Sequence, residues 1–488
     1  MKKTLLFLGL SCLSTFSAQE NLLDTTYGQN NGTSDFAFYT NGQPSGGLQI
    51  HDTTQLPDGK ILAVGVSFFA RFTANGLLDT TFNNGLGYKL IYPAHSYNMV
   101  KPAGDGNYIV LDGSTGGQIL KIDENGNSVS SFTTYSQPGD YMDMHIDADG
   151  RIYVIRKMSN DHRLVRLLPN GLVDTTFANN GEIALGSTYA YRQVKVNANN
   201  EIFIGGKYQI GQTNRQILVS KFDASGNLVT SFGANGHFLR PAGEYVGDYT
   251  RLELLEDGKI QGFTSGTFCN GNNCFGLIAY RLLPNGTLDP SYKNGGAFVL
   301  PIQSNSDPVK VKRMADNSFI IGGTGHHTMF ALRMKADGNL DPSFGVDGKI
   351  ITPIIGTGSS YVINKGFELY GNSIVLVGIY SIWYGAQTRY VGTVRKYFFS
   401  QNNLSAAEAE RTSDRVKIYP NPVGSNLQFT SKDPVNGYEI YDMNGKRMMH
   451  SAGPVKNNSI NVNDLLPGNY ILKLETPKEV IVMKFIKK

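Results

Sequence analysis

Several things that this chain has little of limit what it can be. Its 488 residues include only three cysteines and one tryptophan. Beyond the N-terminus, no stretch approaches the ~20 consecutive apolar residues that a membrane helix needs, so no transmembrane segment is predicted. The formal net charge is +4, without a basic run, and so small an excess argues against nucleic acid as a partner.

The chain also lacks the common catalytic signatures. It has no Gly-x-Ser-x-Gly elbow, His-Glu-x-x-His helix, P-loop or dinucleotide fingerprint, so we predict no catalytic residue, metal or cofactor. The adjacent pair His326 and His327 is interpreted as a solvated hairpin loop, because neighbours on an extended strand point to opposite faces. Asp147 to Gly150 resembles half of a calcium loop, but Asp-Gly turns recur along the chain, which favours turn chemistry.

The N-terminus has the three regions of a secretory signal peptide. Lys2 and Lys3 precede an apolar stretch over residues 5–10, and small residues then lead to Ala18. This order predicts export through the Sec translocon and cleavage after Ala18, with a buried N-terminal strand or helix as the alternative. Cys12 also allows a lipoprotein, which we disfavour because Gly9 stands where a lipobox has leucine. The mature chain is expected to be soluble once exported.

Two cysteines remain after cleavage, Cys269 and Cys274, and they flank an Asn-Gly turn. A close, even pair in an oxidising compartment predicts a small loop disulfide. A metal site is the weaker interpretation, because two thiolates fill half of a tetrahedral shell and no histidine lies in the same loop.

One short phrase recurs along the chain at spacings of 45 to 60 residues. Its fullest form is Leu-Asp-x-Ser/Thr followed by an aromatic residue, and the aromatic residues are Tyr27, Phe82, Phe132, Phe177, Phe232, Tyr292 and Phe344. Each interval also contains a turn such as Asp58-Gly59 followed by a β-rich run. Asp-Gly between strands predicts a tight hairpin, because the turn needs positive φ and glycine supplies it.

Each unit is therefore predicted to hold four short strands, and no long segment has a helical period. In the seventh unit the predicted strands span 349–354, 361–369, 373–378 and 389–397. Four-stranded units repeated around a ring are typical of a β-propeller, and we predict seven blades over residues 19–399. The alternatives are an open β-solenoid or a string of independent sheets.

The ends of the repeat favour a closed ring. The seventh unit has no phrase after its last strand, and Leu23 to Tyr27 at the start of the mature chain supplies one. Such a join would protect exposed strand edges. The recurring aspartate is expected to cap a turn by accepting backbone N–H bonds, and the recurring aromatic residue is expected to pack between blades.

These phrases resemble the bacterial delta-60 repeat family, whose units carry Leu-Asp-x-Ser-Phe-Gly-x-x-Gly. Residues 340–348 fit this pattern best, and residues 127–132 depart from it most because they lack the aspartate. The resemblance covers about residues 22–399. It implies a β-propeller and says little about activity.

A polar linker, residues 400–415, precedes a region with its own strand and turn pattern. Residues 416–488 are predicted to form a small Ig-like antiparallel β-sandwich of about seven strands. Three motifs follow one another there, and their principal residues are Tyr419, Pro420, Asn421 and Pro422, then Gly445 and Lys446, then Gly468 and Tyr470. Together they resemble the type A C-terminal sorting domain of type IX secretion cargo. This implies that the secretion machinery carries the protein from the periplasm to the cell surface or the medium.

The variable segments between strands are predicted to lie at one end of the blades. They are rich in Tyr, Ser, Gly and Asn, a composition typical of adaptable recognition surfaces, although solubilising loops are an equal alternative. The candidate ligand contacts are Tyr189, Tyr191, Tyr245, Tyr249, Trp383 and Tyr384.

Three functions remain open. We predict a monomeric, non-enzymatic propeller for binding or adhesion, with a glycan or a surface protein as ligand. The alternatives are a secreted polysaccharide hydrolase or lyase with its site in the central funnel, and a structural surface protein without a small ligand. Carboxylates and arginine converging on the channel mouth would favour the enzyme, and aromatic residues on an open face without them would favour binding.

Overall fold

The computed structural model describes residues 22–400 and 417–488, apart from gaps at 30–31, 37–38, 41–42, 45–48, 93–94, 115, 160, 211–213, 242–245, 268–274, 301, 303–306, 326–327, 353–361, 385–386, 432–433, 443–446, 452 and 477–479. The chain divides into two compact units between Phe399 and Ser400. Outside the described residues lie the predicted signal peptide, residues 401–415 of the linker, Cys269 and Cys274, Tyr245, His326 and His327, and Gly445 and Lys446.

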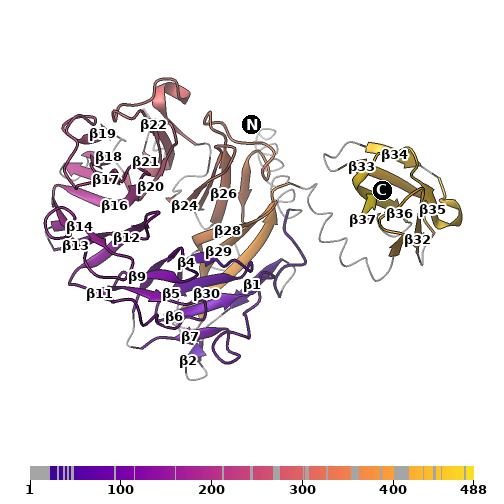
Figure 1. The fold of residues 1–488 in the computed structure, drawn as a ribbon, viewed down its shortest axis with the longest axis horizontal. Helices are drawn as coiled ribbons and strands as arrows, with labels where there is room; N and C mark the ends of the chain where they lie inside the picture. Colours follow the sequence, from indigo (N-terminus) through magenta and orange to yellow (C-terminus); the bar gives the residue numbers. More distant parts are fainter. Residues whose placement is uncertain are drawn as a thin grey trace, which may run out of the picture. The chain divides into compact units, whose positions relative to one another are not determined.

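The described part of residues 33–398 folds into seven four-stranded antiparallel sheets, named blades 1 to 7 (Figure 1). With the innermost strand first, blade 1 is β4 (Ile50–Gln55), β5 (Ile61–Gly65), β6 (Phe68–Phe72) and β7 (Tyr88–Leu90); blade 2 is β8 (Tyr97–Pro102), β9 (Tyr108–Asp112), β10 (Gln118–Ile122) and β11 (Tyr135–Ser136); blade 3 is β12 (Asp140–Ile146), β13 (Ile152–Met158), β14 (Asp161–Leu167) and β15 (Glu182–Gly186).

The remaining blades follow the same order. Blade 4 is β16 (Tyr189–Val196), β17 (Ile202–Ile210), β18 (Asn214–Phe222) and β19 (His237–Pro241); blade 5 is β20 (Val246–Leu254), β21 (Ile260–Thr267), β22 (Phe275–Leu282) and β23 (Ala297–Val299); blade 6 is β24 (Asp307–Arg313), β25 (Phe319–Gly325), β26 (Thr328–Met334) and β27 (Lys349–Ile351); blade 7 is β28 (Val362–Tyr370), β29 (Ser373–Tyr384), β30 (Gln387–Phe398) and β1 (Thr33–Phe36). Outside the blades, β2 (Tyr39–Thr40) pairs with β3 (Gln43–Pro44), and a 3₁₀ turn, η1, spans Lys293–Gly296.

The blades form a closed ring. Their innermost strands contact one another in the order β4, β8, β12, β16, β20, β24, β28 and back to β4. Blade 7 is completed from the start of the chain, because β1 pairs with β30, with Thr33 opposite Arg395. Leu23 forms a further bridge to Tyr397. The β-propeller prediction is confirmed, and the N-terminal segment joins the two ends of the ring as its phrase predicted.

The structural blade is offset by one strand from the repeat unit defined on the sequence. Residues 349–351, predicted to open the seventh unit, are instead the outermost strand of blade 6. The recurring phrase therefore connects the third strand to the fourth within one blade. The offset arises because a periodic sequence reveals the length of the repeat but not the point at which one sheet ends.

The recurring aspartate caps a turn, as predicted. In blade 1, Asp79 Oδ1 accepts hydrogen bonds from the backbone N–H of Thr81 at 3.0 Å and from its hydroxyl at 2.7 Å. The same pair of bonds is made by the other four aspartates of the phrase, which are Asp24, Asp174, Asp289 and Asp341. A cation adds a second contact, since Arg71 Nε lies 2.6 Å from Asp79 Oδ2. This ion pair was not predicted from the phrase.

The recurring aromatic residues pack between neighbouring blades, which confirms the second prediction for the phrase. Tyr27 is 2% exposed and lies in one cluster with Ile50 of blade 1 and Val375 of blade 7. Each of the other junctions has its own cluster, with Phe82, Phe132, Phe177, Phe232, Tyr292 and Phe344 respectively. Burial of one large ring per junction supplies much of the apolar contact between blades.

Polar side chains also connect the blades along the central channel. The innermost strand of a blade has no neighbouring strand on its channel side, so its buried backbone groups need other partners. The Val100 N–H donates to Asp52 at 3.0 Å, and the Val194 N–H donates to Asp143 at 2.8 Å. Going around the ring, the contacts are Asp52–Val100, Lys101–Met144, Asp143–Val194, Gln193–Leu252, Arg251–Val309, Lys310–Glu368 and Thr53–Glu368. Every junction therefore has a polar contact as well as an aromatic one.

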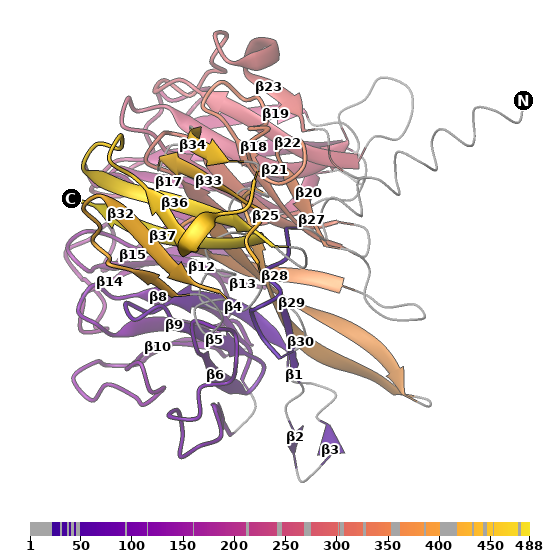
Figure 2. The same cartoon turned by 90° about the vertical axis from the view of Figure 1, so that its right-hand side faces the viewer.

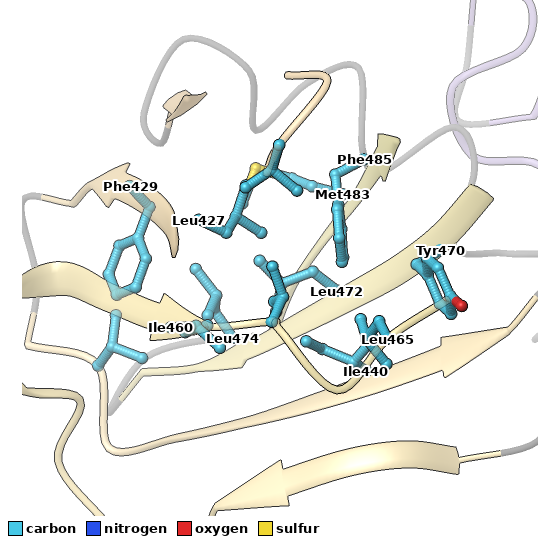
Figure 3. Packing of buried hydrophobic residues seen from close by; sticks show 13 residues of the cluster. Leu427, Phe429, Ile440, Ile460, Leu465, Tyr470, Leu472, Leu474, Met483 and Phe485 are labelled. Atoms are coloured by element: carbon cyan, nitrogen blue, oxygen red, sulfur yellow. The ribbon is translucent and has the colours of Figure 1, made fainter. Parts of the chain in front are cut away.

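The second unit is a small β-sandwich. One sheet has the order β31 (Lys417–Tyr419), β32 (Asn426–Thr430) and β35 (Ser459–Asn461), and the other has the order β34 (Arg447–Ser451), β33 (Gly437–Asp442), β36 (Gly468–Glu475) and β37 (Val480–Lys487). A 3₁₀ turn, η3, spans Lys456–Asn458. Figure 3 shows its core, in which Leu427 and Phe429 of β32 pack with Leu472 and Leu474 of β36. Two sheets around one core agree with the predicted sandwich.

Replacing Tyr27 with alanine is expected to destabilise the propeller by about 3–5 kcal/mol, the usual cost of removing a buried aromatic ring. The ring of Tyr27 fills the seam between blades 7 and 1, where the two ends of the chain meet. Thermal unfolding of the full chain measures the effect. Tyr92→Ala is the matched control, because Tyr92 is 73% exposed. Equal melting temperatures for the two variants would contradict the role of Tyr27 in joining blades 7 and 1.

Acid is expected to weaken the junction between blades 3 and 4 through His145. Burial, with Lys101 and Lys195 nearby, lowers its pKa to about 3, and its ring donates to the Val196 carbonyl. In the unfolded chain the pKa of His145 returns to ~6.5. Between pH ~6.5 and about 3, therefore, the unfolded chain binds a proton at His145 and the folded chain does not. The free energy of unfolding consequently falls as the pH falls through this range. At pH 5 this proton lowers the free energy of unfolding by about 2 kcal/mol relative to pH 7.5.

The check is the free energy of unfolding between pH 7.5 and 5. His145→Gln should lose less stability over this range than the parent chain does. The exposed His450 is a matched control position, and His450→Gln should leave the pH dependence as it is. An unchanged pH dependence in His145→Gln would refute the assignment.

Candidate functional site

A cavity of about 270 Å³ lies in the central channel, and all seven innermost strands contribute to its wall. Each blade contributes at least one residue to the wall. In the order of blades 1 to 7, examples are His51, Asn98, Asp143, Lys195, Arg251, Lys310 and Lys365. These residues span more than three hundred positions in the sequence. The ring brings them together because each blade presents its first strand to the axis.

The pairing register breaks near the start of each innermost strand, and in several blades the residue left out of the pairing lines this cavity. The pairing register shifts between Ile50 and Asp52 in β4, between Tyr97 and Met99 in β8, and at the equivalent place in each of the other five strands. A bulge leaves one residue unpaired and re-aims its side chain. His51, Asn98 and Lys365 are bulged residues, and all three line the cavity.

The cavity wall is rich in positive charge. It carries five cationic side chains, Lys101, Lys195, Arg251, Lys310 and Lys365, against three carboxylates, Asp52, Asp143 and Glu253. The carboxylates already have partners: Asp52 and Asp143 accept backbone N–H bonds, and Glu253 Oε1 lies 2.8 Å from Lys195 Nζ. Burial raises the pKa of Asp52, and Lys310 acts in the opposite direction.

The cations of the cavity fall into two kinds. Lys310 Nζ lies 2.7 Å from Glu368 Oε1; its burial is outweighed by Glu368 and Asp52, so that its pKa is raised. Burial instead lowers the pKa of Lys101 and of Lys365. His51 responds to the same surroundings: burial, with Lys365 nearby, lowers its pKa to about 4, so it is uncharged at neutral pH.

A polar network that was not predicted from the sequence lies beside His51. Asp112 is fully buried, and its Oδ2 lies 2.6 Å from His95 Nδ1. Its Oδ1 accepts hydrogen bonds from the backbone N–H groups of Ser96 and Ser114. The Ser96 hydroxyl is 3.4 Å from His51 Nδ1, which connects this network to the cavity wall. Among the described residues, this arrangement of His95, Ser96 and Asp112 occurs in blade 2 alone. The repeat pattern of the sequence therefore could not indicate it.

The predicted ligand contacts of blade 4 have different environments. Tyr191 is 2% exposed, and its ring packs edge-on against His162 of blade 3 at 5.8 Å between centroids. Tyr191 is therefore a residue of the blade interface, and the prediction that it lies on a ligand-binding surface is wrong. Tyr189 is half-buried, with the rings of Tyr208 and His237 at 5.1 and 4.8 Å.

Three further predicted contacts, Tyr249, Trp383 and Tyr384, lie on strands and not in loops. Tyr249 belongs to β20, and Trp383 and Tyr384 belong to β29, where their backbones pair with Thr388 and Gln387. Figure 2 shows β29 and β30 extending beyond the neighbouring strands as a hairpin. This hairpin projects from the end of blade 7 at which β28 begins, which is also the end that carries the bulged residue Lys365.

The sorting motifs of the second unit divide into surface and core residues. Tyr419, Pro420, Asn421 and Pro422 are exposed, and Asn421 Oδ1 accepts a hydrogen bond from the Ile486 N–H of the last strand. Tyr470 is 6% exposed; it stacks on Phe485, and its hydroxyl donates to the Leu466 carbonyl. Gly468 pairs with Lys487 at the start of β36. The first motif and the end of the chain therefore meet at one edge of the sandwich.

The described residues also bear on metal binding and on membrane insertion. Among the described residues, no group of three or more His, Cys, Asp or Glu side chains is placed to hold a metal ion. Asp147, from the segment that resembles a calcium loop, forms an ion pair with Arg151 at 2.7 Å. A search of the described residues for helices long and apolar enough to cross a membrane finds none.

Two family models match the chain. One, described as a secretion system C-terminal sorting domain, matches residues 417–488. The other, described as a domain of unknown function (DUF5122) beta-propeller, matches residues 56–82, 148–177 and 255–292. No curated protein matches the sequence.

Several solved structures of low sequence identity are similar to parts of this chain. A protein of unknown function from Dyadobacter fermentans is 11% identical, with a TM-score of 0.38, and the match covers 75% of this chain and 99% of that one. The polysaccharide lyase Uly1 is 9% identical, with a TM-score of 0.42 and coverage of 74% and 94%. A protein of unknown function from Bacteroides caccae is 11% identical, with a TM-score of 0.33 and coverage of 59% and 96%.

The family models agree with the two folds described above. The repeat that they match is the one that builds the blades, and the sorting domain that they match is the whole of the C-terminal sandwich. The chain is therefore a β-propeller protein that ends in a type IX secretion sorting domain and is exported to the cell surface or the medium.

Proposed function

We propose that this exported propeller binds a ligand, and does not transform it, at the bacterial surface or in the medium. The observation that supports this most is the state of the channel carboxylates. Asp52 and Asp143 each accept a backbone N–H from the next blade, and Glu253 is paired with Lys195. Hydrolysis or elimination on a polysaccharide needs an acid or a base whose proton is available to the substrate. Carboxylates that cap strand edges are poorly placed for that role.

The surroundings of the channel suit recognition. The β29–β30 hairpin carries Trp383 and Tyr384 at the same end of blade 7 as Lys365. Tyr92, which is 73% exposed, precedes the strand that opens blade 2. Aromatic residues supply large contact areas at low entropic cost and are frequent anchors in binding sites. A glycan or a surface protein is the proposed ligand, and adhesion is the proposed consequence.

A secreted hydrolase or lyase is the second candidate, and one observation favours it. The pair formed by His95 and buried Asp112 resembles an oriented general base, because a carboxylate at 2.6 Å fixes the imidazole. In the described residues, however, the neighbouring Ser96 hydroxyl lies against His51 and Asn98, so the arrangement is not a serine, histidine and aspartate relay.

A panel of polysaccharides should distinguish the two candidates. The mature full chain is expected to be retained on at least one polysaccharide, without release of reducing ends or of unsaturated sugars. Affinity electrophoresis measures the retention, and assays for reducing ends and ultraviolet absorbance measure the products. Steady product release that disappears in His95→Ala would refute the binding role and support the enzyme.

The sorting domain generates a separate prediction for the cell. Deleting residues 416–488 should leave the propeller folded but confined to the periplasm, because each unit has its own core. Immunoblots of periplasm, cell surface and medium, with the full chain expressed in the same strain as control, follow the protein. Normal amounts of the truncated chain in the medium would show that the domain is not required.

A further inference from the structure

The electrostatic character of the channel points to the kind of ligand it takes. The cavity wall carries five cationic side chains against three carboxylates, and all three carboxylates already have partners. Burial, with Lys101 and Lys195 nearby, lowers the pKa of His145, and burial, with Lys365 nearby, lowers the pKa of His51. A wall that disfavours additional positive charge favours an anion in the same space.

Among the five cations of the cavity wall, Lys365 is the one for which the fold shows no structural role. The other four cations of the wall all bind a carboxylate or a backbone carbonyl of a neighbouring blade. Among the described residues, the side chain of Lys365 has neither an ion pair nor a hydrogen bond, and burial alone accounts for the lowering of its pKa. Lysine is rarely buried without a partner, because removing its charge from water is costly. A half-buried lysine with no structural partner therefore weakens the ring unless a ligand supplies the negative charge.

The size of the cavity limits the ligand. At about 270 Å³ it is slightly smaller than the ~300–1,000 Å³ of sites that enclose a drug-sized molecule. It therefore admits a small group, such as one sugar unit, and leaves the remainder of a chain outside. Asn98, which is exposed at the rim, and neutral His51 add polar atoms of the kind that bind sugar hydroxyls.

We propose that the channel mouth around Lys365 binds the anionic group of an acidic glycan, either the carboxylate of a uronic acid or a sulfate ester. This inference rests on the proposed binding function and names its ligand class. Lys365 forms the primary ion pair with the anion, and Lys101 adds positive charge deeper in the channel. Asn98 and His51 bind hydroxyl groups of the same sugar.

The test compares two lysine variants of the mature full chain. Polygalacturonate probes the carboxylate, heparin probes the sulfate, and dextran is the neutral reference. The parent chain is expected to bind at least one acidic polymer, with an affinity that falls as salt rises, and not to bind dextran. Lys365→Gln should weaken this binding at least tenfold. Lys335→Gln removes the same charge from an exposed position outside the cavity wall and should leave binding unchanged.

A stability measurement separates recognition from folding. Because Lys365 lacks a structural partner, Lys365→Gln and Lys365→Met should melt at or above the temperature of the parent chain. Galacturonate or sulfate ions should raise the melting temperature of the parent more than that of these variants, because sulfate also stabilises folded proteins in general. A marked fall in the melting temperature of both variants would assign Lys365 to folding and overturn the proposal.

The binding results also separate this inference from the function on which it rests. Equal binding of acidic polymers by the parent and Lys365→Gln would overturn the proposed site. Binding of dextran or of surface proteins alone would overturn the acidic ligand and leave a binding propeller in place. Degradation of any polymer by the parent chain would overturn the binding function itself.

Discussion

The unpaired edge of the innermost strand is the constraint on which this propeller depends. Each blade completes its hydrogen bonds toward the outside, but its first strand faces the channel with no neighbouring strand on that side. Buried amide and carbonyl groups cannot be left without partners. Side chains of adjacent blades supply such partners at the junctions from blade 1 to blade 6, as with Asp143 and the Val194 N–H. The polar lining of the channel is thus first a requirement of the fold.

This requirement distinguishes charged residues that stabilise the fold from charged residues that are available for function. A carboxylate that caps a strand edge has an explanation in the fold, and so has a lysine paired with Glu368. Lys365 has no such explanation in the described residues, and the pair of His95 and Asp112 occurs in blade 2 alone. In a repeat protein, features that every blade shares are expected to serve stability. Features that one blade alone carries are the natural candidates for function.

The same division applies to the sorting domain. Tyr470 is recognisable in the sequence as part of a sorting motif, yet its ring lies in the core and its hydroxyl closes a turn. Tyr419 belongs to the first motif and is 47% exposed, next to the last strand of the chain. Residues of a family motif therefore include some that maintain the fold and others that remain accessible. Only their burial distinguishes the two.

The sequence by itself determined the C-terminal sorting domain, the repeat, the propeller and the sandwich. These follow from local patterns: turn residues such as Asp58-Gly59, alternating strands, and a phrase whose aspartate and aromatic residue act within one junction. It also indicated the seam, because one unit lacks a phrase that the N-terminus contains.

Only the tertiary structure decided what lies in the channel. A register break interrupts each first strand, and in six of the seven it shifts the alternation by one residue. The side chains that face the axis therefore cannot be read from the strand pattern. The residues that cap the strand edges include aspartate, lysine, glutamine and arginine, so they leave no repeating signal. His51 and Lys365 line the same cavity because ring closure places blade 7 beside blade 1, and no local property of either segment specifies that arrangement.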